Sequence, residues 1–219
     1  MKQFLKLIKA SRNELRKNRN KFWGKNKRDF SKNILRIINS QKLPKKFKIY
    51  VVASNFINKK NIMPYDWDSW SSTALIGATK KQEFELMMFF NRARSEFLSL
   101  PALIPLVAHE LYHVKQASRS PKKFLMSVIN DKFSKEIEKE ADSKIKNIEE
   151  FRKEKILEMI LYCYDIKGWS SAKKMADYLY KHHKKMYGGG YSSEMTIKEY
   201  KLFLKSMKTG NINLFINSF

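Results

Sequence analysis

The segment that most constrains how this chain can fold is PALIPLVAHELYHVKQAS, residues 101–118. It predicts one continuous helix, because its two prolines suit a first helical turn and no helix breaker follows before Ser120-Pro121. His109 and His113 lie four residues apart, so on a helix they share one face, one turn from each other. Their imidazoles either pack as ordinary core histidines or converge on a single metal ion.

Glu110, which follows His109 directly, has a place in metal-assisted hydrolysis. It lies about 100° around the helix from His109, so it cannot share the ion but can reach a water molecule bound to it. Zinc lowers the pKa of such a water to about 7, and an adjacent carboxylate can take its proton as the water attacks a carbonyl carbon. The pattern predicts a hydrolytic site if a third ligand exists.

A second segment, FSKEIEKEADSKI at residues 133–145, supplies a candidate for that ligand. On a helix, Glu138 and Asp142 share one face that is otherwise apolar, whereas Glu140 lies about 200° from Glu138, on the expected solvent side. This geometry selects Glu138 as the third metal ligand. Asp142, one turn further on, is placed to accept a hydrogen bond from the other ring nitrogen of a ligand histidine. The alternative interpretation is a solvated helix with surface salt bridges.

The HExxH motif followed by ExxxD on a separate helix resembles the gluzincin zinc metallopeptidases. The sequence EKEAD is similar to the corresponding segment of ImmA/IrrE-like and minimal single-domain gluzincins. The resemblance covers residues 84–145 at most. It implies that His109, His113 and Glu138 hold Zn²⁺, that Glu110 is the general base, and that Asp142 supports a histidine. It also implies that the strand at residues 84–90 is an edge strand along which an extended peptide substrate binds.

Peptidases of this kind need a further donor to stabilise the oxyanion of the tetrahedral intermediate. Tyr191, after the run Gly188–Gly190, is a candidate because consecutive glycines permit a mobile loop or a close backbone approach. The alternative is a helix C-cap followed by a packed tyrosine. A SprT-like arrangement would instead use His182 or His183 as third ligand in place of Glu138.

The remaining patterns predict an α+β, zincin-like fold. Three short segments between residues 47 and 91 are rich in β-branched or aromatic residues and predict a small, mostly antiparallel sheet packed on the HExxH helix. The C-terminal half is expected to be helical, at about 121–130, 134–167 as one helix or two, 171–186 and 197–208. A Thr196-x-x-Glu199 capping box opens the last of these.

The N-terminal zone is the most basic part of the chain. Residues 1–48 contain 17 Lys and Arg, against Glu14 and Asp29. Apolar residues recur there at helical spacing, which predicts either two helices docked on the core or an arm that binds nucleic acid. We expect residues 1–45 to be a basic helical extension and residues 46–219 to be the metallopeptidase domain.

The net charge of +24 makes DNA, RNA or an anionic membrane surface a plausible neighbour. The single cysteine, Cys163, excludes an internal disulfide, and no segment approaches the roughly 18 apolar residues of a membrane span. We expect a cytoplasmic protein, or one packaged in a virion if it comes from a phage. The leading hypothesis is a zinc metalloendopeptidase acting on protein or peptide substrates. The alternative is a basic nucleic-acid-binding or virion-packaged protein whose zinc site is structural or vestigial.

Overall fold

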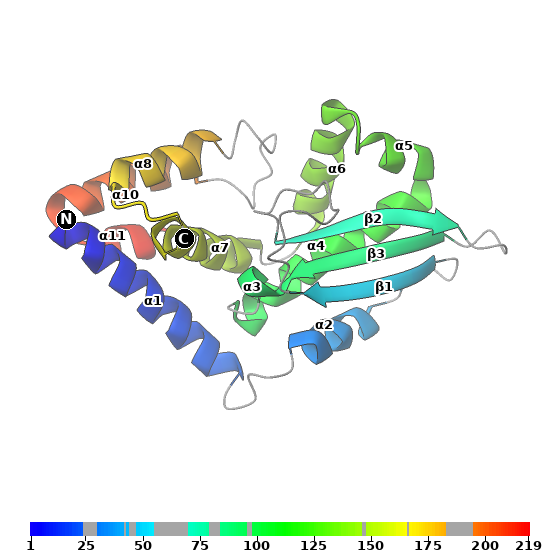
Figure 1. The fold of residues 1–219 in the computed structure, drawn as a ribbon, viewed down its shortest axis with the longest axis horizontal. Coiled ribbons are helices and arrows are strands. Elements are labelled where there is room, and N and C mark those ends of the chain that lie inside the picture. Colours follow the sequence, from blue (N-terminus) through cyan, green and yellow to red (C-terminus); the bar gives the residue numbers. More distant parts are fainter. Residues whose placement is uncertain are drawn as a thin grey trace. The chain divides into compact units, whose positions relative to one another are not determined.

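The computed structural model describes residues 1–23, 30–41, 43, 47–54, 70–78, 84–95, 98–145, 148–165, 167–182 and 195–219. Over these residues the chain is α+β and mostly helical, with one three-stranded sheet (Figure 1). It forms two compact units. The sheet unit comprises Asn26–Phe97 and Leu103–Ile145, and the helical unit comprises Met1–Lys25, Leu98–Ala102 and Lys146–Phe219.

The sheet contains β1 (Phe47–Ser54), β2 (Ser71–Ala78) and β3 (Phe84–Asn91) in the spatial order β1-β3-β2. β2 is antiparallel to β3, whereas β1 is parallel to it, so the sheet is mixed and the expectation of a mostly antiparallel sheet is wrong. The short connection between β2 and β3 makes them antiparallel neighbours. β1 and β2 follow one another in the sequence but lie on opposite sides of β3.

The central position of β3 also corrects a second expectation. The strand at residues 84–90 is not an edge strand, because β1 and β2 flank it on both sides (Figure 1). Its side chains Leu86, Met88 and Phe90 are fully buried, as the alternating pattern of a central strand requires. Among the described strands, β2 therefore forms one edge of the sheet.

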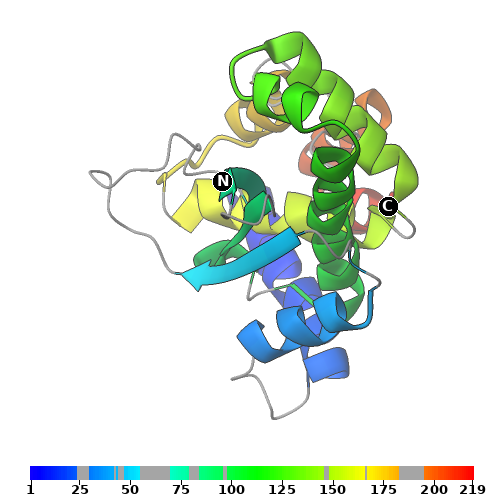
Figure 2. The same cartoon turned by 90° about the vertical axis from the view of Figure 1, so that its right-hand side faces the viewer.

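The sheet unit also contains α2 (Phe30–Asn39), α3 (Arg92–Ser95), α4 (Leu100–Arg119), α5 (Pro121–Met126) and α6 (Asp131–Lys144). α4 is the predicted HExxH helix, and its first residues belong to the helical unit. Its apolar side chains Val107, Leu111 and Val114 are buried. The view turned by 90° shows the green helix α4 running beside the sheet (Figure 2).

The helical unit contains α1 (Lys2–Trp23), α7 (Ile148–Asp165), α8 (Ala172–Asp177), the π-helix η1 (Tyr178–His182), α10 (Ile197–Thr209) and α11 (Asn213–Ile216). The predicted stretch 134–167 is thus two helices, α6 and α7. The capping box is confirmed, since Thr196 and Glu199 each accept a hydrogen bond from the other's backbone amide. Cys163 is buried in α7.

The apolar residues that predicted the two N-terminal helices are mostly in the core. Phe4, Ile8 and Leu15 of α1 are buried, as are Phe30 and Ile34 of α2. By its contacts with other residues, α1 belongs to the helical unit and α2 to the sheet unit. This grouping does not test whether residues 1–45 are an extension, so that boundary stays a prediction. None of the described helices has the length and apolar character that crossing a membrane requires.

Candidate metal centre

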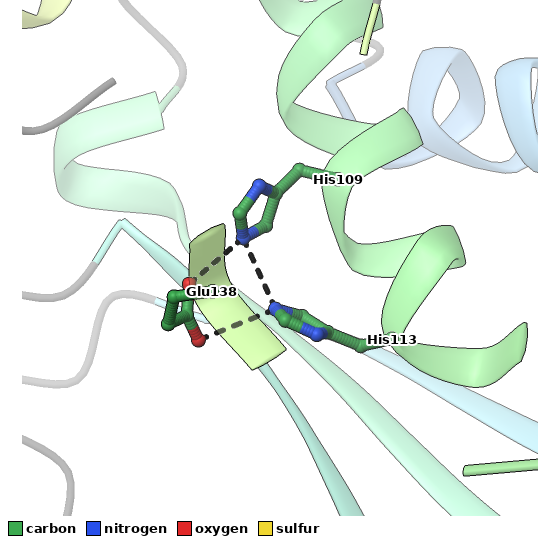
Figure 3. A group of neighbouring side chains, drawn as sticks. All are labelled: His109, His113 and Glu138. Carbon is green, nitrogen blue, oxygen red and sulfur yellow. Dashed lines mark hydrogen bonds and ion pairs between the residues drawn. The ribbon is translucent and has the colours of Figure 1, made fainter. Parts of the chain in front are cut away.

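Helices α4 and α6 bring the three predicted ligands together (Figure 3). The Nε2 atoms of His109 and His113 lie 3.0 Å apart. One carboxylate oxygen of Glu138 lies 3.1 Å from Nε2 of His109, and the other lies 3.3 Å from Nε2 of His113. Both histidine side chains are nearly buried, whereas the side chain of Glu138 is 42% exposed, so the cluster is accessible from the solvent.

Both imidazoles are oriented by a hydrogen bond on the ring nitrogen that faces away from the cluster. His109 Nδ1 donates to Oδ1 of Asp142 at 3.0 Å. His113 Nδ1 donates to Oε1 of Gln116 at 2.7 Å. Since each Nδ1 donates its hydrogen outward, Nε2 is the nitrogen of each ring that is left to bind an ion at the shared point.

Sequence reasoning did not identify Gln116. Its Nε2 donates to the backbone carbonyl of Ile137 and to the carboxylate of Glu140, both at 3.0 Å, so it connects His113 on α4 to the helix that carries Glu138. A signal was present, because residue 116 follows His113 by three and His109 by seven and therefore shares their helix face.

Glu140, which was expected on the solvent side, is partly exposed, and its carboxylate also contacts side chains of α4. Besides Gln116, its carboxylate accepts hydrogen bonds from Tyr112 Oη at 3.0 Å and from Arg119 at 2.7 Å. The Arg119 guanidinium, then Gln116 and Tyr112, hold the pKa of Glu140 at about 2. Glu140 thus remains ionised and anchors the α4 side chains that support the site.

The cluster favours positive charge. Burial lowers the pKa of His109, but its hydrogen bonds to Asp142 and Glu138 and the nearby carboxylate charges outweigh burial and raise that pKa to about 10. Burial raises the pKa of Glu138, but the charge of His113 and the hydrogen bond from His109 outweigh it and hold that pKa well below its ordinary value. The surrounding carboxylates thus favour a positive charge at this position.

Glu110 faces the sheet and is 3% exposed. Ser71 Oγ donates to one of its carboxylate oxygens and Thr73 Oγ1 donates to the other, both at 2.6 Å. These hydroxyls point from β2 toward α4, because residues 71 and 73 lie on the same face of the strand. The sequence contained no signal for this pairing, since 37 or more residues separate the partners.

The donor set fits a tetrahedral zinc ion. Zinc with bonds of about 2.0–2.1 Å places its ligand atoms about 3.3 Å apart, close to the three separations in this cluster. Two imidazole nitrogens and one carboxylate suit zinc, and three protein ligands leave a fourth position for water or substrate. Among the described residues, His109, His113 and Glu138 form the group that could hold an ion.

Comparisons were made with protein-family models, with curated proteins and with solved structures, and none of them matches this chain. What can be inferred about its function therefore depends on the residues themselves.

Three other predicted site residues are not placed at the site. Tyr191 and His183 lie outside the described residues, and His182 ends η1 with a side chain that is also outside the description. The roles of Tyr191 as an oxyanion stabiliser, and of either histidine as a ligand, stay predictions.

Proposed function

We propose that the protein is a zinc-dependent metalloendopeptidase with a zincin-like catalytic unit of the gluzincin type. His109, His113 and Glu138 would hold the ion, and Asp142 and Gln116 would orient the histidines. The observation that carries the proposal is the convergence of both Nε2 atoms and the Glu138 carboxylate on one point, each histidine being fixed from behind. Salt-bridged surface residues have no reason to adopt that arrangement.

When bound, zinc supplies a Lewis acid that polarises the scissile carbonyl and acidifies a water molecule. Glu110 is the general base: it takes the proton from the attacking water and passes it to the leaving amine. The hydroxyls of Ser71 and Thr73 keep its carboxylate in one orientation. Because this carboxylate is buried and held at both oxygens, little reorganisation is needed before proton transfer.

The substrate would be an extended peptide that pairs with the edge of β2. The edge of β2 is open to pairing, whereas β3, the strand expected to bind substrate, has neighbours on both sides. β2 also carries the two hydroxyls bound to Glu110, so a peptide along its edge would pass close to the general base. Backbone pairing of this kind suits an endopeptidase, since it needs no free chain end.

The alternative is a structural or vestigial zinc site in a basic protein. A structural site usually has four protein ligands, whereas the group among the described residues has three. Glu110 directly follows the first histidine, where a general base of zinc-dependent hydrolysis would lie. Both points favour catalysis.

Cleavage of casein by the zinc-loaded protein tests the proposal. Chelation with EDTA should abolish cleavage, and added zinc should restore it. Glu110→Gln should still bind one zinc ion per chain but lose at least about a thousandfold in rate, because the general base is gone. Lys115→Gln, an exposed change on the same helix, should cleave like the wild type.

Cleavage that survives both chelation and Glu110→Gln would disprove the proposal. Bound zinc without cleavage by the wild type would favour the structural alternative. Zinc content measured on each variant separates loss of the ion from loss of the base.

A further inference from the structure

The outer face of α1 carries mainly cations, with Leu5 and Asn13 also exposed among them. Residues 2, 6, 9, 16 and 17 follow the spacing of one helix face, and all are exposed. We call this set, which consists of Lys2, Lys6, Lys9, Arg16 and Lys17, the α1 stripe. At 1.5 Å per residue it extends along about 22 Å of the helix.

A second set lies on α10, which contacts α1 within the same unit. Residues 198, 201, 205 and 208 also follow one helix face and are exposed. This α10 stripe consists of Lys198, Lys201, Lys205 and Lys208. Two helices of the helical unit, α1 and α10, thus present lysine-rich faces.

The acidic residues of these two helices point away from the stripes. Glu14, the one acid in α1, accepts a hydrogen bond from Lys153 of α7 at 2.9 Å. Glu199, the one acid in α10, is buried in an ion pair with Arg152. On α6, in contrast, exposed acids accompany the exposed lysines, and Glu136 pairs with Lys123 at 2.8 Å. The separation of charge on α1 and α10 is therefore not a simple result of the high net charge.

We infer that the helical unit binds the phosphate backbone of a nucleic-acid duplex through the α1 stripe, with the α10 stripe as a second contact. A duplex carries one negative charge per about 1.7 Å of its axis, so a 22 Å row of cations faces many phosphates. A lysine ammonium group binds a phosphate through its charge and makes no contact with a base here, so we expect the binding to be independent of the nucleotide sequence.

A membrane surface fits this face less well than a duplex. An interfacial helix binds lipid by burying an apolar face in addition to the electrostatic attraction of its cations. The apolar side chains of α1 are used inside the protein, since Phe4, Leu7, Ile8 and Leu15 are all buried and Leu5 alone is 45% exposed within the stripe. A single strand is also a poorer fit, because no aromatic side chain described on α1 or α10 is exposed for base stacking.

This activity goes beyond peptide hydrolysis and does not depend on it. The stripes belong to the helical unit, whereas the candidate metal centre belongs to the sheet unit. Loss of zinc should leave duplex binding unchanged, so each proposal can fail without the other.

Fluorescence anisotropy of a labelled 30-base-pair duplex, titrated with the full-length protein at several salt concentrations, tests the inference. The triple variant Lys6→Gln, Lys9→Gln, Arg16→Gln should bind about ten- to a hundredfold more weakly at 0.15 M salt. Its plot of log K against log salt should be shallower by roughly 2 to 3, because about 0.9 of a counterion is released per phosphate contact. The matched control is Lys122→Gln, Lys132→Gln, Lys135→Gln, which removes the same charge from exposed sites on α5 and α6.

Equal weakening by both triple variants would overturn the inference, since net charge alone would then explain binding. Absence of duplex binding by the wild type, or binding to phosphatidylserine vesicles in preference to the duplex, would overturn it as well. A weaker α1 variant beside an unchanged control, with unaltered thermal unfolding of both, supports it.

Discussion

At the scale of single residues, the candidate site is defined by hydrogen positions on two imidazoles. Asp142 holds a hydrogen on Nδ1 of His109, and Gln116 does the same for His113. Gln116 is only 4% exposed and also binds Glu140, so its amide cannot flip without losing contacts on both sides. A neutral amide thus supports one histidine, while a carboxylate supports the other.

Replacing Gln116 tests this support directly. Gln116→Leu keeps most of the side-chain volume but frees the ring of His113, so zinc affinity should fall about ten- to a hundredfold. Competition with a chromophoric chelator measures the affinity, and the exposed neighbour Lys115→Gln is the control. An unchanged zinc affinity for Gln116→Leu would show that packing alone orients the imidazole.

At the scale of secondary-structure elements, a buried ion pair joins α7 to α10. The side chains of Arg152 and Glu199 are both nearly inaccessible to solvent. The carboxylate of Glu199 also accepts a hydrogen bond from the backbone amide of Thr196, the N-cap of α10. Burial raises the pKa of Glu199, but the ion pair with Arg152 and the hydrogen bond from the Thr196 amide outweigh burial and lower it below 4.5. The folded state thus favours the ionised form.

The sign of this shift sets a pH dependence. A carboxyl group whose pKa is lower in the folded state than in the unfolded state stabilises the fold at pH values above its unfolded-state pKa of 4.5. This contribution is lost as the pH falls through the pKa of the folded state. Glu199→Gln should cost about 3–5 kcal/mol at pH 7, because the buried Arg152 loses its ion pair with this carboxylate. Between pH 5 and 3 its free energy of unfolding should decline less steeply than that of the wild type. Denaturant titrations measure both values, with the exposed Glu150→Gln as control; equal slopes would contradict the assignment.

At the scale of the whole molecule, the chain enters and leaves each unit more than once. The helical unit is assembled from three separate stretches, and α4 begins in that unit before it continues into the sheet unit. The three candidate ligands, their supporting residues and Glu110 all belong to the sheet unit. A ligand at the site therefore stabilises one of the two units directly.

Hydrogen exchange with and without zinc should reveal this division. An ion that binds only the folded state stabilises it. At a free zinc concentration of a thousand times Kd, the free energy of unfolding of the part of the protein that must open to release the ion rises by about 4 kcal/mol. Amides of α4 after residue 103 and of α6 should then exchange more slowly, while those of α7 and α10 should change little. An equal rise in protection of α7 and α10 would mean that the chain opens as one cooperative unit.

Features that depend on local spacing could be predicted from the amino-acid sequence. Two histidines at i and i+4, and Glu138 and Asp142 at the same interval, have a defined direction on any helix. The three candidate ligands and one candidate supporting residue could therefore be proposed before the fold was known. The capping box at Thr196 and Glu199 is local in the same sense. Class α+β also followed from the periodicities alone.

Which helices and strands contact one another could not be predicted in the same way. The strand order depends on how a long connection crosses the sheet, and no local pattern encodes that path, so β3 was wrongly expected at the edge. For the same reason the hydroxyls of Ser71 and Thr73 could not be connected with Glu110, nor Glu140 with Gln116. Periodicity specifies the direction of a side chain from its own helix or strand, whereas the partner it reaches depends on the packing of residues distant in sequence.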